Sequence, residues 1–476
     1  MKKYSFLILF LILILGFALR YYRINSPLAD WHSWRQADTA SVTRIYVEEG
    51  INLLYPKYYD ISTIQSGIFN PEGYRFVEFP IYNLFHAYLV KLFPQYGLEY
   101  LGRLLSIFFG LISTICLFII GKKFWGDIGG LLSAVFYAFI PFNVYFTRVI
   151  LPEPLSVCLG LISLCILLSY LDNKKEIYLY LGSFVLSLAI LVKPFVVFYV
   201  LPIVFLIFKN EGIKKVFLQK KYHFASFITL TPFALWRLWV SQFPEGIPFF
   251  WWMFNGGDIR FKPSFWRWIF AERIGSLILG SWGLIVLGFG MLRKNNYTPL
   301  FPLIFLVSSF LYLTIFAQVN VQHDYYQIFI VPALCLVLTQ GVLSMWYQKE
   351  WDVLVTRFVL LFSLFVMFVA PMSQVKGMFN INHPEIIWAG EAVDRLVPKD
   401  ALVVAPYNGD TAFLYQTKRR GWPFIDRPID EIVNLGADFF VSVDLAHPQT
   451  REIMQKYEIV EKTDSYVIVD FSKPKI

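Results

Sequence analysis

Side chains able to do acid–base, phosphate-binding or metal chemistry gather in three short segments of this chain. The first segment, residues 29–50, carries Asp30, His32, Arg35, Gln36 and Asp38. If this segment is helical, Arg35 and Asp38 are three residues apart on one face. A buried carboxylate there could act as a general base or bind a divalent cation. The alternative interpretation is an amphipathic helix start in which Asp38 is only solvated.

The second segment is residues 147–156, in which Glu153 stands between two prolines and follows Arg148. Proline favours the first turn of a helix, so Glu153 would lie near the positive end of a helix dipole. That position alone could explain the residue. The functional interpretation is a second catalytic or cation-binding carboxylate that faces Asp38 across a site.

The third segment, residues 321–338, opens with His323 and an aspartate, followed by two tyrosines that include Tyr326. His323 could donate a hydrogen bond to a phosphate or ligate a metal. Alternatively, these side chains belong to the aromatic belt that flanks membrane spans. Arg237 and Arg273 are further cations beside apolar runs, where simple membrane anchoring is the competing explanation.

The composition indicates the kind of element that positions these groups. Of the 476 residues, 57% are hydrophobic, 19% aromatic and only 16% charged, and the mean hydropathy is +0.54. These values exclude a soluble enzyme, a disordered chain and a disulfide-built secreted domain. The four cysteines lie inside apolar runs without metal-ligand spacing. We therefore predict an all-α polytopic membrane protein.

About eleven apolar runs are candidates for transmembrane helices. The run at residues 80–93 is too short to span a bilayer and is expected to form an interfacial helix. The predicted spans are residues 4–19, 99–121, 128–147, 154–171, 177–192, 194–208, 223–241, 273–292, 298–317, 325–346 and 353–372.

Charge along the chain predicts the orientation. Lys2 and Lys3 and alternate short loops are basic, among them the turn at Arg293 and Lys294, and basic loops face the cytoplasm. We therefore predict a multi-pass protein of the cytoplasmic (inner) membrane with its N-terminus inside and its C-terminus outside. The net charge of +8 then reflects topology and gives no reason to expect a nucleic-acid partner.

Two domains are predicted. Residues 1–375 form the transmembrane domain, with a first outer loop at residues 21–98 and an aromatic outer loop at residues 242–272. Residues 376–476 form a small extracytoplasmic α/β domain, to which we assign no catalysis because it lacks a Gly-rich phosphate loop. Strands are expected at residues 401–405, 439–443 and 466–471, and helices at residues 384–397, 427–436 and 448–457.

The three segments together resemble the GT-C superfamily of membrane glycosyltransferases, and in particular family 39, the group of protein O-mannosyltransferases and lipid A aminoarabinose transferases. The resemblance covers the membrane part, with an outer C-terminal domain as a common addition. In that family the first outer loop carries an Asp-Glu motif. The matching stretch here is HSWRQADTA, residues 32–40, where the pair would fall at Arg35 and Gln36. The acid role then passes to Asp38 or Asp30, or is absent.

Other family motifs map in the same way. Glu153, preceded by Arg148, resembles an acidic residue of the next outer loop. A Lys-Pro-Pro motif, which contacts the lipid phosphate in the aminoarabinose transferases, is replaced by Glu78, Phe79 and Pro80. The resemblance implies substrate-binding roles for His32, Gln36 and Glu78. The candidates for binding the donor phosphate are Arg35, Arg148, Arg237, Arg273, His323 and Tyr326.

The resemblance implies an enzyme that transfers a hexosyl or pentosyl group from a polyprenyl-phosphate-linked donor, with inversion, at the outer membrane face. The acceptor would be a cell-envelope lipid, polysaccharide or protein, as in lipopolysaccharide or protein glycosylation. Asp38, Glu153 and Asp30 are the candidate catalytic residues. A divalent cation, Mg²⁺ or Mn²⁺, on Asp38 and Glu153 is a further expectation. The alternatives are a transferase of a non-sugar group, an O-antigen ligase, a sugar-lipid flippase and a catalytically inactive lipid-binding relative.

Overall fold

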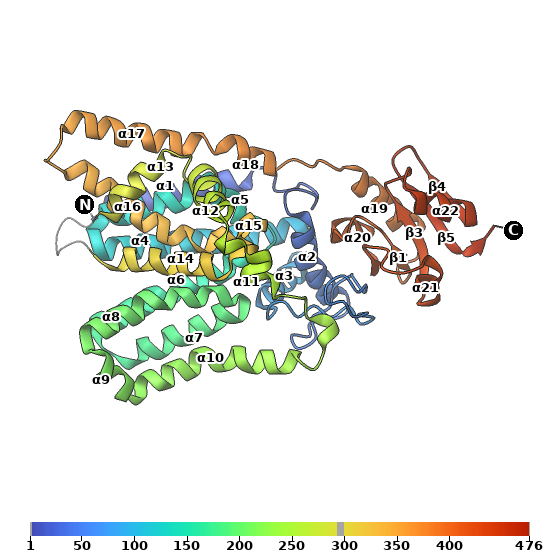
Figure 1. The fold of residues 1–476 in the computed structure, drawn as a ribbon, viewed down its shortest axis with the longest axis horizontal. Helices are drawn as coiled ribbons and strands as arrows, with labels where there is room; N and C mark the ends of the chain where they lie inside the picture. Colours follow the sequence, from blue (N-terminus) through green and yellow to red (C-terminus); the bar gives the residue numbers. More distant parts are fainter. Residues whose placement is uncertain (1, 293–298, 476) are drawn as a thin grey trace. The chain divides into compact units, whose positions relative to one another are not determined.

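The computed structural model of the chain describes residues 2–292 and 299–475 (Figure 1). Its residues form two compact units. The first, called here the helical unit, comprises Met1–Ile24, Arg103–Trp236 and Phe250–Met378. The second, called the mixed unit, comprises Asn25–Gly102, Arg237–Phe249 and Phe379–Ile476. Most of the predicted first outer loop thus belongs to the same unit as the C-terminal residues.

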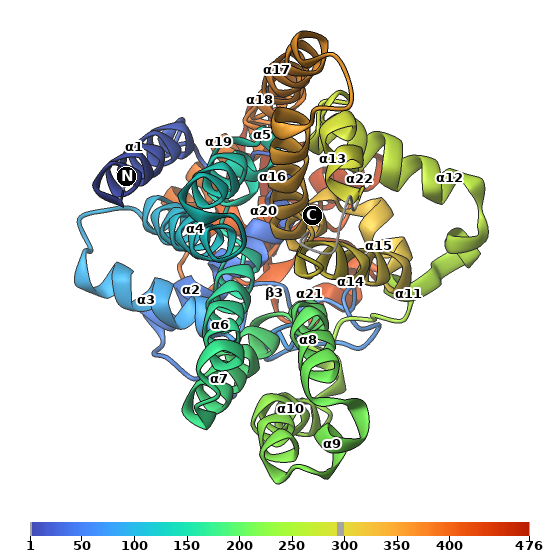
Figure 2. The ribbon, with the colours of Figure 1, turned by 90° about the vertical axis from the view of Figure 1, so that its left-hand side faces the viewer.

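The helical unit consists of apolar helices and short irregular connections. Figure 2 views these helices end-on, with α6 beside α7 and α13 beside α16. The α-helices are α1 (Lys2–Tyr21), α4 (Leu98–Phe139), α5 (Pro141–Phe146), α6 (Glu153–Asn173), α7 (Glu176–Val192), α8 (Leu201–Glu211), α9 (Ile213–Leu218), α10 (Lys220–Val240), α11 (Trp252–Asn255), α12 (Pro263–Trp266), α13 (Gly283–Met291), α14 (Phe301–Ile315), α15 (Ala317–Gln322), α16 (Val331–Tyr347), α17 (Val353–Val369) and α18 (Met372–Met378). The 3₁₀ and π segments are η1 (Pro194–Val200), η3 (Gly256–Phe261), η4 (Arg267–Ile278) and η5 (Asp324–Phe329).

Helix α4 is two apolar helices joined by a sharp break. Trp125 and Gly126 leave helical geometry, and Gly126 has φ +68°. A Cβ atom on Gly130 would lie 2.7 Å from the backbone oxygen of Phe118, so the two halves approach closely where side chains are absent. This break separates the spans predicted at residues 99–121 and 128–147.

The span predicted at residues 273–292 is not one straight helix. The π-helix η4 is followed by α13 at an angle of 114°. Gly280 and Ser281, between them, have φ values of +53° and +59°. Two consecutive left-handed residues cannot continue a right-handed helix, so the chain bends there.

Among the described residues, five helices are long and apolar enough to cross a membrane, or six if the bent pair counts as one span. The short run at residues 80–93 is helix α3 (Ile81–Leu92), whose 12 residues reach only about 18 Å. The predicted basic turn at Arg293 and Lys294 lies outside the described residues. The predicted polytopic helical fold is confirmed, while the count of eleven spans stays a prediction.

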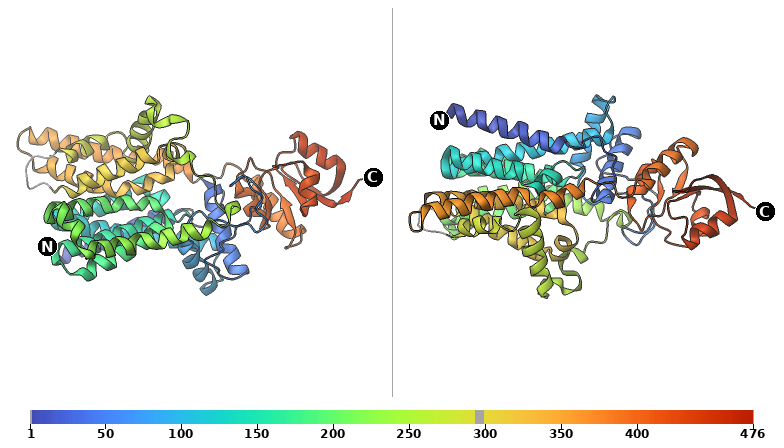
Figure 3. Two further views of the ribbon diagram at one scale, coloured as in Figure 1. Left: turned by 60° about the horizontal axis from the view of Figure 1, so that its bottom comes forward. Right: turned by 90° about the horizontal axis from the view of Figure 1, so that it is seen from above.

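The mixed unit contains a five-stranded sheet, in the red part of Figure 3, with the order β2-β1-β3-β5-β4. Strand β1 is parallel to β2 and β3, whereas β5 is antiparallel to β3 and β4. The strands are β1 (Leu402–Val404), β2 (Gly421–Trp422), β3 (Ala437–Ser442), β4 (Tyr457–Lys462) and β5 (Val467–Pro474). The helices are α2 (Ser33–Glu48), α3, η2 (Pro244–Gly246), α19 (Glu385–Leu396), α20 (Thr411–Thr417), α21 (Ile429–Asn434) and α22 (Pro448–Lys456).

This sheet confirms the predicted small α/β fold of the C-terminal residues. All three predicted strands and all three predicted helices are present, at β1, β3, β5, α19, α21 and α22. Helix α20 and strands β2 and β4 were not predicted. Strand β2 has only two residues, and β4 is mostly exposed, so neither carries a strong apolar pattern.

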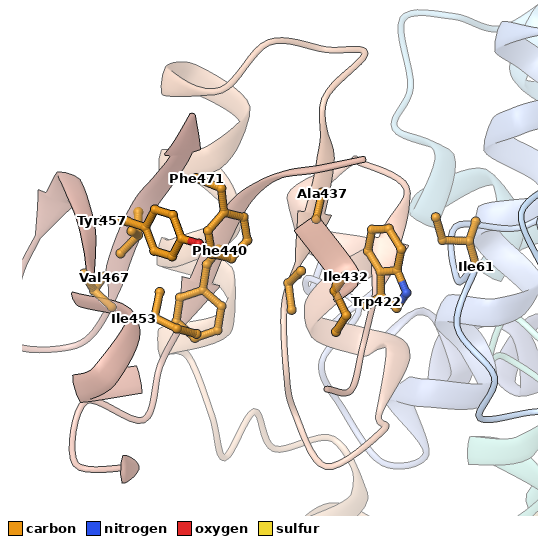
Figure 4. Packing of buried hydrophobic residues seen from close by; sticks show 11 residues of the cluster. Ile61, Trp422, Ile432, Ala437, Phe440, Ile453, Tyr457, Val467 and Phe471 are labelled. Atoms are coloured by element: carbon orange, nitrogen blue, oxygen red, sulfur yellow. The ribbon is translucent and has the colours of Figure 1, made fainter. Parts of the chain in front are cut away.

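The first outer loop packs onto the edge of this sheet. Ile61 joins the core around Trp422 and Phe440 (Figure 4), and Phe69 stacks on Trp422. The Gly421 N–H donates to Tyr59 O at 2.9 Å, and the Ile61 N–H donates to Gly421 O at 3.0 Å. The loop therefore adds backbone pairing beyond β2, which fixes its position against the C-terminal residues.

Candidate active site

Asp38 is the centre of a buried polar cluster in the mixed unit. It lies on α2 and is 1% exposed. Its Oδ2 accepts a hydrogen bond from Arg75 Nη2 at 2.6 Å, and its Oδ1 accepts one from Thr411 Oγ1 at 2.7 Å. A buried carboxylate is costly unless it is paired and hydrogen-bonded. Here one cation and one hydroxyl provide that compensation.

A small pocket lies beside Asp38. Its wall includes Arg35 and Glu78, which form an ion pair at 2.7 Å. The structure therefore brings together three of the predicted site residues. Arg35 and Asp38 lie one turn apart on α2, and Glu78 lies in the loop before α3. The full lining is Arg35, Asp38, Thr39, Val42, Pro56, Arg75, Glu78, Pro80 and Asn83.

The other predicted residues of the first loop lie at the start of α2. Gln36 Nε2 donates to Asp30 Oδ1 at 2.8 Å, and both side chains are buried. His32 precedes the helix with φ 55°, a left-handed conformation. Its ring contacts Trp31 edge-on, with 5.1 Å between the ring centroids. Asp30 and Gln36 thus help to hold the turn that leads into α2.

Two acids near Asp38, Asp60 and Asp410, were not predicted as site residues from the sequence. Burial raises the pKa of Asp60 to about 6 and that of Asp410 to about 6, and the negative charge of Asp38 adds to both shifts. Arg75 and Thr411 were not predicted either, because they are 37 and 373 residues from Asp38 in the chain. No local motif could have signalled these contacts.

In the helical unit, Glu153 begins α6 and faces Lys193. Lys193 Nζ lies 3.1 Å from Glu153 Oε1, with exposed side-chain fractions of 4% and 1%. The ion-pair distance is short, yet neither Glu153 oxygen meets hydrogen-bond geometry with a described residue. The Tyr326 ring centroid is 5.6 Å from Lys193 Nζ, which adds a cation–π contact. Lys193 has extended backbone between α7 and η1.

The remaining candidates of the helical unit fall into two places. Arg148 is fully buried, and its Nη2 donates to Arg23 O at 2.9 Å. Arg273 forms an ion pair with Asp324 at 3.5 Å and donates to a backbone carbonyl at 3.1 Å. His323, next to Asp324, stacks with Tyr325 at 5.6 Å between ring centroids. Arg273 and His323 therefore share one neighbourhood.

The predicted site residues are thus divided between the two units. The helical unit contains Arg148, Glu153, Arg273, His323 and Tyr326. The mixed unit contains Asp30, His32, Arg35, Gln36, Asp38, Glu78 and Arg237. Arg237, near the end of α10, is half-buried.

The predicted divalent cation on Asp38 and Glu153 is not confirmed by the described residues. No group of three His, Cys, Asp or Glu side chains within the described ranges could hold one. The oxygens of Asp38 accept hydrogen bonds from Arg75 and Thr411, and Glu153 faces the ammonium group of Lys193. Positive and hydrogen-bonding groups therefore already occupy positions that a cation would take beside these carboxylates.

Comparisons with known proteins agree with this architecture. Residues 79–239 match the family model described as dolichyl-phosphate-mannose-protein mannosyltransferase, a stretch that includes Glu153 and Lys193. ArnT from Cupriavidus metallidurans, bound to undecaprenyl phosphate, is similar with a TM-score of 0.66 and 11% identity over 97% of each chain. Its apo structure gives a TM-score of 0.68 and 11% identity over 98% of each chain.

A second solved protein shares the fold over most of its length. The archaeal oligosaccharyltransferase AglB from Archaeoglobus fulgidus, in complex with an inhibitory peptide and a dolichol-phosphate, has a TM-score of 0.57 and 10% identity. The match covers 98% of this chain and 74% of that chain. No curated protein sequence matches this chain. The shared fold and the family-model match confirm the resemblance seen in the sequence: the chain resembles the GT-C membrane glycosyltransferases, in particular those of family 39.

Proposed function

We propose that this protein transfers a sugar from a polyprenyl-phosphate-linked donor to a cell-envelope acceptor, at the outer face of the cytoplasmic membrane and with inversion. The observation that supports this most is the fold similarity, over nearly the whole chain, to a structure bound to undecaprenyl phosphate. The family model matched by residues 79–239 is likewise named for a polyprenyl-phosphate sugar donor.

The proposed donor has an apolar part and a polar part. Its polyprenyl tail would stay among apolar helices, while phosphate and sugar need polar groups at the membrane boundary. Arg273 is the strongest of the proposed phosphate ligands in the helical unit. Its Nε is buried without a hydrogen-bond partner among the described residues. A guanidinium group can hold phosphate oxygens through paired N–H donors.

Asp38 is the proposed general base. A carboxylate has several lone pairs. Asp38 can therefore take the proton from the hydroxyl group of the acceptor substrate while it keeps its contacts with Arg75 and Thr411. The hydroxyl oxygen then forms a bond to the anomeric carbon. The bond from that carbon to the phosphate oxygen breaks, and its electron pair leaves with the polyprenyl phosphate. A single displacement of this kind inverts the configuration. Glu153, in the helical unit, is a second proposed catalytic carboxylate.

The test is transfer by the purified full chain in lipid nanodiscs, supplied with polyprenyl-phosphate hexoses and pentoses and with cell-envelope acceptors. We expect Asp38→Asn and Glu153→Gln to lower the rate by about 100-fold or more, within the range for a lost acid–base group. Glu458→Gln, on the exposed strand β4, is the matched control and should keep wild-type activity. Full activity in both site variants would contradict the proposed roles.

The same preparation distinguishes the competing functions. A sugar-lipid flippase would move a fluorescent polyprenyl-phosphate sugar across vesicles without transferring the sugar. An inactive relative would bind polyprenyl phosphate and do neither. Either result, obtained with folded wild-type protein, would overturn the proposal.

A further inference from the structure

We infer that Thr411, which begins helix α20, is a positioning residue for Asp38, so that the C-terminal residues complete the candidate site. This inference rests on the proposed function, in which Asp38 is the base. It also revises the expectation that the C-terminal residues have no part in catalysis.

The contact itself is short and buried. Thr411 is 6% exposed, and its Oγ1 lies 2.7 Å from Asp38 Oδ1 and 3.1 Å from Trp34 O. The shorter contact reaches a carboxylate, and such charge-assisted hydrogen bonds are the stronger kind. Arg75 holds the other Asp38 oxygen at 2.6 Å. With a donor on each oxygen, the plane of the carboxylate is fixed and the remaining lone pairs have a defined direction.

Helix α20 is held against the first outer loop by contacts along its length, which keeps Thr411 in place. Arg44 donates to Tyr415 O at 3.2 Å, and its guanidinium carbon lies 4.0 Å from the Tyr415 ring centroid. The Tyr415 hydroxyl donates to Glu99. Gln416 Nε2 donates to Leu28 O at 2.8 Å. These residues lie within the mixed unit, so the Thr411–Asp38 contact belongs to one compact body.

If the base rotates away from the acceptor hydroxyl, the enzyme's transfer rate falls while its affinity for the substrate is unchanged. Proton transfer requires hydrogen-bond distance in the reacting complex, and small misplacements of a catalytic group are costly. Thr411 is therefore expected to affect kcat more than KM. A purely structural threonine would not produce that separation.

The first experiment replaces the hydroxyl while keeping the side-chain shape. Thr411→Val should lower kcat about tenfold or more and change KM for the donor by less than about twofold, as expected for a lost hydrogen bond to a charged group. Thr411→Ser, which restores the hydroxyl, should recover most of the rate. Thr417→Val is the matched control on the same helix, because the Thr417 hydroxyl donates to Leu414 O instead. Equal kcat in Thr411→Val and wild type would overturn the inference.

The second experiment is independent of activity. Thermal unfolding of the wild type, Thr411→Val, Asp38→Ala and the double variant forms a double-mutant cycle. If the hydroxyl holds the carboxylate, Thr411→Val should lower the unfolding temperature in the wild-type background and much less in the Asp38→Ala background. Additive shifts would overturn the inference. Coupled shifts in a protein that transfers no sugar would support the contact and refute the proposed function instead.

Discussion

The buried pair of Glu153 and Lys193 gives the sharpest stability prediction for this protein. Replacement of Lys193 by Met keeps the length of the side chain but removes its charge. Glu153, which is 1% exposed, would then remain buried without its cation. The ammonium and carboxylate groups are 3.1 Å apart, so their Coulomb attraction at an effective dielectric constant of about 20 is about 5 kcal/mol.

The expected effect of Lys193→Met is therefore a loss of about 3–5 kcal/mol in the free energy of unfolding, the range seen when one partner of a buried ion pair is removed. The double variant Glu153→Gln/Lys193→Met should recover most of this loss, because it leaves no unpaired charge. Lys174→Met is the control. Lys174 pairs with Glu211 at 3.4 Å, but its side chain is 48% exposed, so the expected cost is below about 1 kcal/mol.

The measurement is reversible unfolding of the four proteins in mild detergent, titrated with a denaturing detergent. The reasoning would be refuted if Lys193→Met and Lys174→Met were equally stable. It would also be refuted if the double variant were less stable than Lys193→Met alone.

Three further predictions concern other parts of the chain. Burial, with the nearby charge of Asp38, raises the pKa of Asp410 to about 6, so its contribution to stability is present below the unfolded-state value of about 4 and is lost as the pH rises through about 6. Asp410→Asn keeps the oxygen that caps α20, and it should be about 2 kcal/mol more stable than wild type at pH 7.5 and equal to it at pH 4, measured by thermal unfolding; equal stability at both pH values would contradict this. A Cβ atom on Gly290 would lie 2.0 Å from a backbone oxygen of α16, whereas Gly288 on the same helix has open space; Gly290→Ala should cost about 1–3 kcal/mol in denaturation and Gly288→Ala should not, and equal costs would be inconsistent with this packing. A reporter that is active only outside the cytoplasm, fused after residue 375, should be active, and a silent fusion would show that the predicted orientation is wrong.

Local sequence was enough to predict much of the fold because the signals are local. Apolar runs mark helices wherever backbone groups must be satisfied inside a bilayer, and alternating or β-branched runs mark strands. The predictions were weaker where conformation depends on single residues. The bend after η4 depends on the backbone of Gly280 and Ser281, and the two-residue strand β2 is defined by its pairing with β1.

Only some residues of the candidate site could be predicted from the sequence, for the same reason. Asp38, Arg35 and Glu153 lie in short polar motifs, so their types and spacing marked them as candidates. Arg75 and Thr411 carry no local signal, since their importance lies in distances of 2.6 and 2.7 Å to Asp38. The same holds for Lys193, whose importance lies in its distance of 3.1 Å to Glu153.

By itself, the sequence determined that this is a polytopic helical protein with a small α/β addition, because hydrophobic periodicity is a property of neighbouring residues. Its polar motifs added a resemblance to the GT-C glycosyltransferases. Tertiary structure alone decided how the carboxylates are compensated. It placed Arg75 and Thr411 on Asp38 and Lys193 on Glu153. A buried charge needs a partner in space, and the chain supplies that partner from wherever the fold brings it close.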